Sequence, residues 1–206
     1  MFAARNAFMA GSKSPVSFIG GNGNAVVPAH VAGDLIVIWA GNWGSAPAKP
    51  AAGGTVPEWT DISVTGLGRL CWCIGTGSTT AGSWSVAYAY TTVWRGGSKI
   101  GASAVESGSY GLAFPDLTLV EAGGTSAILG LTAVNNSGMS VSYPNTGTFD
   151  ITVPGQSSTT GNYKFMAGYR VKAKTGTGAT GFGNPWIATY PNPPAAAVNL
   201  AVEIQA

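Results

Sequence analysis

The hexapeptide GTGATG at residues 176–181 fits the pattern G-x-G-x-x-G, which in dinucleotide-binding proteins connects a strand to a helix. In such a site the amides of the first helical turn hold the pyrophosphate. Here the charged stretch VKAK (171–174) precedes the glycines, and Gly183 and Pro185 follow too closely for a helix to form. We therefore interpret the hexapeptide as a loop at the end of a hairpin and expect no nucleotide cofactor.

Acid–base chemistry has few candidates in this chain. His30 is the single histidine. On a strand, His30 and Asp34 would stand about 13 Å apart, too far for a Ser-His-Asp triad, and the chain has no G-x-S-x-G motif. A glycosidase, however, needs just two carboxylates that face each other across a cleft. The acidic residues that leave this class open include Asp34, Glu58, Asp61, Asp116, Asp150 and Glu203.

The two cysteines, Cys71 and Cys73, are separated by one residue. On a strand this spacing places both side chains on one face, about 7 Å apart, where a disulfide would be strained. A Cys-x-Cys metal site would need further soft ligands, and the chain offers one histidine. We predict two small buried thiols and no metal.

Sugar-binding sites present flat aromatic faces, so the seven tryptophans are candidate ligand platforms. Trp59, Trp72 and Trp84 fall within strand patterns and are predicted to pack in the core. Trp43 and Trp186 lie in predicted loops. They are the candidates for contact with a glycan or with a neighbouring chain, and the alternative is that they pack beneath a loop.

The longest predicted strand, residues 162–174, carries a concentration of positive charge on one face: Lys164, Arg170, Lys172 and Lys174. Solvated lysines that protect a sheet edge from pairing are one explanation. The other is electrostatic docking to an acidic partner surface, such as the outside of a shell, which high salt would weaken.

The whole chain is poor in charge: charged residues make up 9% of its 206 residues, against about 25% in an average protein. Its net charge of +2 gives no general attraction for nucleic acid or an anionic membrane, so neither partner is expected. Low charge also means that copies packed side by side repel each other little. The composition therefore favours repeated assembly, with a secreted Ser/Thr/Gly-rich β protein as the alternative.

The distribution of 31 Gly and 12 Pro leaves almost no room for helices. Two-residue alternation predicts strands at 58–64, 68–75, 83–95, 115–121, 148–153, 162–174 and 197–205. Two more predicted strands, 34–40 and 126–134, are apolar on both faces and need both faces covered. The cover is either a neighbouring subunit or the predicted long loops at 41–57, 96–115 and 175–196.

The first two dozen residues differ in character from the rest. Phe2, Phe8 and Met9 lie on a short stretch that ends in GGNGN (20–24), a composition typical of an arm rather than of a strand. We predict an arm at 1–24, which docks on its own domain or reaches a neighbour, followed by one domain at 25–206. No apolar run has the length of a signal peptide or a membrane span.

Four segments together resemble a β-sandwich module of tailed-phage virion proteins: GDLIVIWAG (33–41), PEWTDISV (57–64), WRGG (94–97) and SAILGLTAV (126–134). In that group the order is a G-D-L-L strand, a loop, P-x-G-W-T, and a strand ending in Y-R-G. Glu58 stands here where the group has the glycine before tryptophan. The resemblance covers residues 31–205 and implies a jelly-roll-like sandwich in a capsid-decorating, fibre or tail-associated protein. It implies no catalytic residues.

We therefore expect an all-β protein, an antiparallel two-sheet β-sandwich of jelly-roll type with an extended N-terminal arm. The leading hypothesis is a non-enzymatic phage virion protein, made in the host cytoplasm, that decorates or cements the capsid as a trimer and carries no cofactor. Decoration is preferred to a fibre because the chain shows no coiled coil or repeated shaft. The alternatives are a receptor- or glycan-binding module of a fibre or tail that uses Trp43 and Trp186, and a glycoside hydrolase.

Overall fold

The computed structural model describes residues 15–42, 45–86, 88–108, 115, 117–121, 123–135, 163–170, 179–180 and 196–206. Of residues 108, 132–135, 163–170, 179–180 and 196–197, it describes the backbone alone.

The described part of the chain forms strands and no helix, as the spacing of Gly and Pro predicts. The strands are β1 (Ser17–Asn22), β2 (Ala32–Gly41), β3 (Thr60–Thr65), β4 (Gly68–Thr76), β5 (Tyr88–Arg95), β6 (Lys99–Gly108), β7 (Leu117–Thr118), β8 (Ala127–Asn135), β9 (Tyr163–Arg170), β10 (Ala179–Thr180) and β11 (Ala196–Gln205). Every strand pairing is antiparallel.

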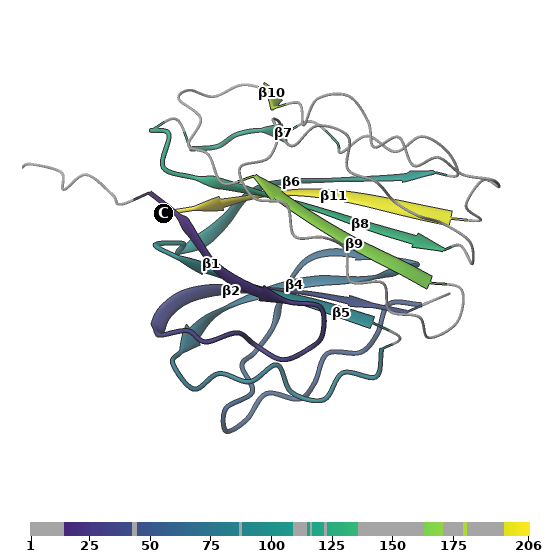
Figure 1. Cartoon of the computed structure of the whole chain (residues 1–206), viewed down its shortest axis with the longest axis horizontal. Coiled ribbons are helices and arrows are strands. Elements are labelled where there is room, and N and C mark those ends of the chain that lie inside the picture. The colour runs from purple at the N-terminus through teal and green to yellow at the C-terminus, as the bar shows by residue number, and fades with distance from the viewer. Residues whose placement is uncertain are drawn as a thin grey trace, which may run out of the picture.

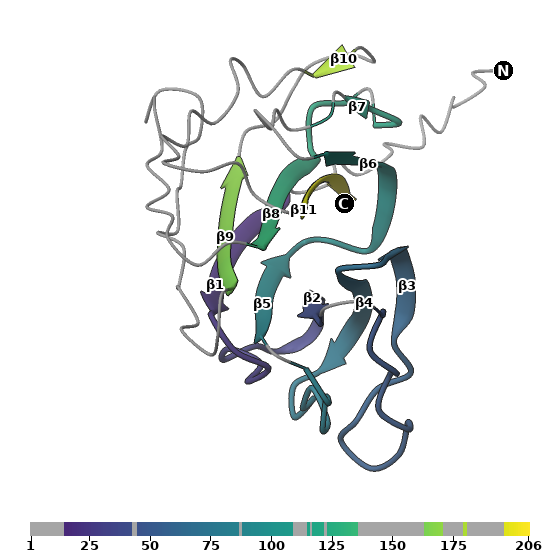
Figure 2. The ribbon, with the colours of Figure 1, turned by 90° about the vertical axis from the view of Figure 1, so that its right-hand side faces the viewer.

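Two sheets lie in two layers. The first sheet has the order β1-β5-β2-β4-β3, the second has the order β6-β11-β8-β9, and β7 pairs with β10 in a small separate sheet. Figure 2 shows the first sheet running from β1 to β3 beneath the second, which runs from β9 to β6. For the residues that the structure describes, the predicted all-β architecture with two antiparallel sheets is thus confirmed.

The inner core fills the space between the two sheets. Because side chains alternate along a strand, every second residue of β2 points to this side: Leu35, Val37 and Trp39, each at most 1% exposed. The facing residues of β11 are Val198, Leu200, Val202 and Ile204. Burial of these side chains from both layers is the main stabilisation that holds the sheets together.

The outer face of the first sheet is also closed. The other residues of β2, Ile36 and Ile38, are fully buried and join Cys71, Cys73, Val93, Trp59 and Ala81 in a second apolar cluster, called here the outer cluster. The loops that follow β1 and β4 lie below this sheet (Figure 1) and contribute Ala25, Val27 and Trp84. Both faces of the doubly apolar strand β2 are therefore covered by the chain itself, not by a neighbouring subunit.

The outer face of the second sheet is buried as well. On β11 the outward residues Asn199, Ala201, Glu203 and Gln205 are at most 3% exposed. Residues 117–121 pass over this face, with Leu117 and Leu119 each 2% exposed, and β7 contacts both β6 and β11 (Figures 1 and 2). Here too the cover comes from the same chain.

Two strands occur where the sequence predicts none. β6 (Lys99–Gly108) lies in the predicted loop 96–115. Its small residues form a strand because they pair with β11, which is ten residues long. β1 (Ser17–Asn22) lies in the predicted arm 1–24, so the arm prediction is wrong for these residues. A Cβ on Gly21 would stand 2.7 Å from the Tyr90 hydroxyl, so glycine here permits a close approach rather than forming a linker.

The predicted strand 83–95 begins later than expected, at Tyr88. Residues 83–86 form no strand, and Trp84 packs on the outer cluster, whereas Tyr88 and Tyr90 belong to the inner core. The predicted alternation, which places Trp84 on the same face as Tyr88 and Tyr90, is therefore wrong for Trp84. The predicted strand 115–121 is reduced to Leu117–Thr118, and 148–153 lies outside the described residues.

Candidate functional site

Seven of the nine predicted interaction residues lie outside the described part of the chain: Phe2, Phe8, Met9, Trp43, Trp186, Lys172 and Lys174. The other two, Lys164 and Arg170, are on β9, where they pair with Val134 and Ile128 of β8. The two positions are six residues apart on the strand, which corresponds to about 20 Å. Among the described strands β9 is the last of its sheet, the position in which lysine and arginine discourage edge pairing.

The GTGATG hexapeptide is described at Ala179 and Thr180. These residues form β10, which pairs in antiparallel fashion with Leu117 and Thr118 of β7. A dinucleotide site needs a helix at this point, with its amides turned to the phosphates. Ala179 and Thr180 instead form a short strand in an antiparallel pair.

Asp34 and Arg95 form an ion pair at the ends of β2 and β5. Arg95 donates from Nε to Oδ1 and from Nη2 to Oδ2, both at 3.0 Å, and the Val31 amide donates to Oδ2 at 2.9 Å. Asp34 is 2% exposed. Burial alone raises the pKa of the Asp34 carboxyl, but the bonds from Arg95 and Val31 outweigh burial and hold the pKa below its ordinary value.

His30 is bound to backbone on both sides of its ring. Nδ1 donates to the Pro28 carbonyl at 2.8 Å, and Nε2 accepts from the Thr79 amide at 3.2 Å, which fits the tautomer protonated on Nδ1. Its bonds therefore join the segment before β2 to the turn after β4. Asp34 is bonded to Arg95 instead, so these two residues do not form a catalytic pair.

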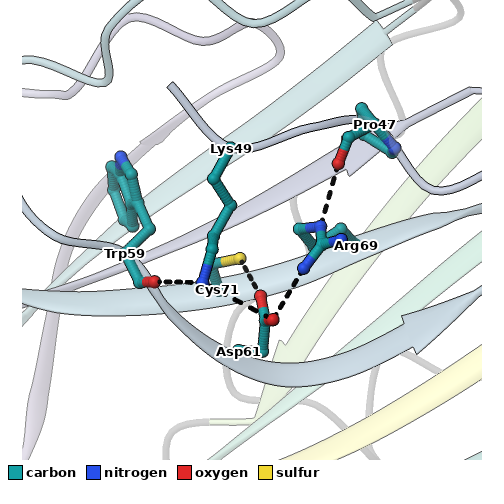
Figure 3. A network of polar contacts seen from close by, with 6 residues as sticks. All are labelled: Pro47, Lys49, Trp59, Asp61, Arg69 and Cys71. Atoms are coloured by element: carbon teal, nitrogen blue, oxygen red, sulfur yellow. Dashed lines mark hydrogen bonds and ion pairs between the residues drawn. The ribbon is translucent and has the colours of Figure 1, made fainter. Parts of the chain in front are cut away.

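Asp61 on β3 is the centre of a polar network (Figure 3). Its carboxylate accepts from Arg69 Nη1 at 2.6 Å and from the Cys71 thiol at 3.1 Å, and Lys49 Nζ lies 3.5 Å away. Burial alone raises the pKa of Asp61, but the Arg69 and Cys71 bonds outweigh it and lower the pKa. Burial raises the pKa of the Cys71 thiol, and the Asp61 carboxylate raises it further.

The same network fastens the 45–59 loop to the first sheet. Arg69 Nε donates to the Pro47 carbonyl at 2.9 Å, and Lys49 Nζ donates to the Trp59 carbonyl at 2.8 Å (Figure 3). Trp59 in turn is 1% exposed and donates from its indole to the Ala81 carbonyl at 3.2 Å. These groups hold a loop over the outer cluster.

The two cysteines are free and buried, as predicted. Both side chains belong to the outer cluster, on the same face of β4. Burial raises the pKa of Cys73 to about 12. Two protonated thiols in an apolar cluster act as small hydrophobic side chains rather than as nucleophiles.

Glu203 is the most deeply buried carboxylate of the described residues, with no exposed area. It accepts hydrogen bonds from the amides of Ala102, Val120 and Glu121 at 3.0, 2.9 and 2.9 Å. Burial alone raises the pKa of Glu203, but the three amides outweigh burial and lower the pKa. The carboxylate fastens the 117–121 segment to the outer face of the second sheet.

Three of the six carboxylates considered for a glycosidase are thus bound in three separate networks: Asp34, Asp61 and Glu203. Glu58 is described and exposed, whereas Asp116 and Asp150 lie outside the described residues. Within the described ranges, no group of three or more His, Cys, Asp or Glu side chains is placed to hold a metal ion. Nor does any described segment form a helix long and apolar enough to cross a membrane.

A groove of about 360 Å³ lies between residues 25–27 and residues 79–82. Its lining is Ala25, Val26, Val27, Thr79, Thr80, Ala81 and Gly82. Sequence reasoning missed this groove because small uncharged residues in two loops carry no periodic or chemical signal. A volume of this size is within the range of ligand-binding pockets.

The residues that carry the family resemblance have structural roles. Asp34 of GDL bonds to Arg95 of WRGG across 61 positions of sequence, and Trp59 of PEWT closes the outer cluster. Comparison of the chain with protein-family models, with curated proteins and with solved structures finds no match in any of the three. The groove is therefore the candidate functional surface that the structure describes, and the basic residues on β9 stay a prediction from the sequence.

Proposed function

We propose that this protein is a non-enzymatic structural component of a bacteriophage virion, a decoration or cement protein bound in many copies to the outside of the capsid. The observation that carries the proposal is the ion pair between Asp34 and Arg95. It joins the two strands whose motifs, GDL and WRG, resemble the virion module. The two motifs therefore belong to one structural unit, and this supports the proposal.

The chemistry of the described polar groups supports a structural role. Asp61 and Glu203 hold loops against the two outer faces, and both nitrogens of His30 are bound to backbone. Groups with these partners fix the shape of the molecule. A rigid, weakly charged surface suits close packing of copies and partners, because little charge must lose its water at each contact.

The complete chain, in this proposal, is a jelly-roll-like sandwich that assembles as a trimer. Residues 1–14 reach a neighbouring molecule, and the basic residues of β9 and the stretch after it, Lys164, Arg170, Lys172 and Lys174, face an acidic shell. Electrostatic docking of this kind weakens as salt screens the charges.

The test is to incubate the purified protein with phage particles from which it has been removed, and to measure its mass in solution and its occupancy on the particles. We expect a trimer, and rebinding that falls as salt is raised. The double variant Lys164→Glu, Arg170→Glu is expected to reduce occupancy at least tenfold. Lys99→Glu, an exposed lysine on β6, is the matched control and retains binding.

Absence of the protein from purified virions, or a monomer that does not rebind, would contradict the proposal. Binding to host glycans that is lost in the double variant Trp43→Ala, Trp186→Ala would instead favour a receptor-binding module of a fibre or tail. Both measurements use the full chain.

A further inference from the structure

The two walls of the groove begin where the pairing of β2 with β4 ends. The last pair is Ala32 with Thr76. Beyond it the two segments separate, and residues 25–27 line one side of the groove while residues 79–82 line the other. His30 bridges these segments just past the end of the pairing. One imidazole ring therefore joins the walls where they leave the sheet.

The backbone partners of His30 admit a single protonation state of its ring. The Pro28 carbonyl can only accept a hydrogen bond, so Nδ1, 2.8 Å away, must carry a proton. The Thr79 amide can only donate, so Nε2, 3.2 Å away, must offer a lone pair. A neutral ring protonated on Nδ1 satisfies both partners. A doubly protonated ring keeps the bond to Pro28 and loses the bond to Thr79.

The ring of His30 is packed closely against the sheet. It lies over Gly75 of β4, where an added Cβ would stand 3.0 Å from His30 Cδ2 and 3.0 Å from the end of Ile36. Glycine at this position permits the close approach. Thr79, on the other side of Nε2, is 4% exposed. With the ring in this place, a second proton points at the N–H of Thr79, and the two donors repel each other.

The titratable and charged groups around the ring do not replace the lost bond. Burial raises the pKa of Asp34 on β2, whereas Arg95, Val31 and, more weakly, a charge on His30 lower it, so this carboxylate faces the ring. Both of its oxygens are already bonded to Arg95 on β5. Burial raises the pKa of Cys73 on β4 to about 12, so its thiol stays neutral. The two wall segments carry no ionisable side chain.

The segment that His30 holds also carries other parts of the cover. The Ala81 carbonyl, two residues after Thr79, accepts hydrogen bonds from the indole of Trp59 at 3.2 Å and from that of Trp84 at 2.9 Å. Ala81 and Trp59 belong to the outer cluster, and Trp84 packs against it. Release of this segment from His30 therefore acts on the layer that shields the outer cluster from water.

We propose that His30 is a pH-sensitive latch: the neutral ring holds residues 79–82 to the segment that contains residues 25–30, and protonation releases them and opens the groove towards the outer cluster. Histidine is the side chain that ordinarily changes charge between pH 5 and 8, and this chain has one. The bond to Thr79 is present at neutral pH and is lost as pH falls, because only the neutral ring offers a lone pair. The latch belongs to the fold and does not depend on the proposed function.

The first test is the tautomer of His30 in the full-length protein at pH 7.5, measured from the nitrogen chemical shifts of the ring by NMR. We expect the proton on Nδ1, as the two backbone partners require. A proton on Nε2 would overturn the inference, because the Thr79 amide would then have no acceptor in the ring.

The second test is hydrogen exchange of the Thr79 amide at pH 7.5 and at pH 5.5, with each rate divided by the intrinsic rate at that pH. We expect the protection to fall at least tenfold at the lower pH, while the amides of Val37 and Ile38 in the middle of β2 keep theirs. The pKa values of Asp34, Asp61 and Glu203 are lowered, so these carboxylates stay ionised at both pH values. Protection of Thr79 that is the same at both pH values would contradict the latch.

His30→Gln is the matched variant. Its side-chain oxygen can accept from the Thr79 amide, and it does not titrate. We expect equal protection of Thr79 at pH 7.5 and pH 5.5 in this variant, and low protection at both pH values in His30→Ala, which offers no acceptor. A tenfold fall that persists in His30→Gln would assign the pH effect to another group and overturn the inference.

The third test measures the opening itself through the two buried thiols of the outer cluster, Cys71 and Cys73. Dipyridyl disulfide reacts with thiols in mildly acidic as well as in neutral solution. We expect its rate with the protein, divided by its rate with glutathione at the same pH, to rise at least tenfold from pH 7.5 to pH 5.5 in the unmodified protein and to stay constant in His30→Gln. A ratio that does not change in the unmodified protein would show that the cover stays closed, and the proposed latch would then be wrong.

Discussion

The two sheets bury their outer faces by different chemistry. Over the first sheet, loops place Trp59 and Ala81 on Ile36, Ile38 and their neighbours, so the buried surface is apolar. Over the second sheet, the outward face of β11 carries Asn199, Glu203 and Gln205, which are equally buried but polar. The first cover encloses an apolar cluster and is tied at its edge by the Asp61 network, whereas the second is bound to the buried face itself by a carboxylate and three amides.

This difference determines what each cover is sensitive to. An apolar cluster loses stability when a side chain is removed, because a cavity remains. A carboxylate held by amides loses stability when the carboxylate is neutralised, because the amides are left with a weaker acceptor in a buried site. Substitutions and changes of pH should therefore affect the stability of the two covers differently.

The largest expected effect is that of Trp59→Ala. Trp59 is 1% exposed over the outer cluster, and removal of a buried aromatic side chain costs about 3–5 kcal/mol of unfolding free energy. Urea denaturation followed by circular dichroism measures the loss. Trp59→Phe, which keeps a ring but removes the indole bond to Ala81, is expected to lose less than half as much; equal losses would show that the hydrogen bond, not the volume, holds this cover.

The second effect is that of Glu203→Gln, which is expected to cost about 2–3 kcal/mol at pH 7, because charge-assisted hydrogen bonds to buried amides are replaced by weaker ones. The folded-state pKa of Glu203 is lowered. Its stabilisation is therefore present above the unfolded value of about 4.3 and is lost as pH falls through the folded value.

Denaturation at pH 7 and again near pH 3 tests this sign. The stability gap between the unmodified protein and Glu203→Gln should narrow at the lower pH. Glu106→Gln, at an exposed position on β6, is the control and should open no such gap at either pH. If the difference in unfolding free energy did not change with pH, the stabilisation by Glu203 would come from the shape of its side chain rather than from its charge.

A smaller effect of opposite sign is expected in the first sheet. Burial raises the pKa of Cys73 to about 12, so its neutral form is favoured in the folded state. The contribution is fully present below the unfolded pKa of about 8.5 and is lost as pH rises towards the folded value, by about 1 kcal/mol per pH unit. In Cys73→Ala the decline in stability from pH 8 to pH 10 should be shallower; an identical decline would exclude the thiol as its source.

The smallest expected effect is that of Lys49→Ala. Its side chain is 37% exposed, and it lies 3.5 Å from an Asp61 oxygen whose side chain is 36% exposed. Solvent-exposed ion pairs contribute about 0.5 kcal/mol or less. Thermal melting should shift by a few degrees at most, and a loss as large as that of Glu203→Gln would mean that the 45–59 loop is held by charge rather than by Trp59.

How far the sequence predicts the fold depends on the element. β2 and β8 were predicted because long apolar runs between Gly and Asn have few alternatives. β6 was missed because Gly, Ala and Ser carry little hydrophobic signal, and its pairing with β11 exists only in the folded chain. β1 was missed because its two glycines, Gly20 and Gly21, have the composition of a linker, although Gly21 lies against Tyr90 in the folded chain.

For the candidate site, the sequence predicts Lys164 and Arg170 as interaction residues because of their charge, but it does not predict the groove. Val26 and Ala81 stand 55 positions apart in two loops, and nothing in either loop indicates the other. The bonds of His30 that join the two walls were also unforeseen, because its partners are backbone atoms.

By itself, the sequence determined that the chain is poor in charge, and it predicted the all-β character of the part that the structure describes, because composition, strand propensity and alternation are local properties of the sequence. Tertiary structure decided which loops cover which face, that Glu203 is a buried anchor, and that a groove stays open above the outer cluster. These features depend on contacts between residues that are far apart in the sequence, and such contacts form only when the chain packs into its tertiary structure.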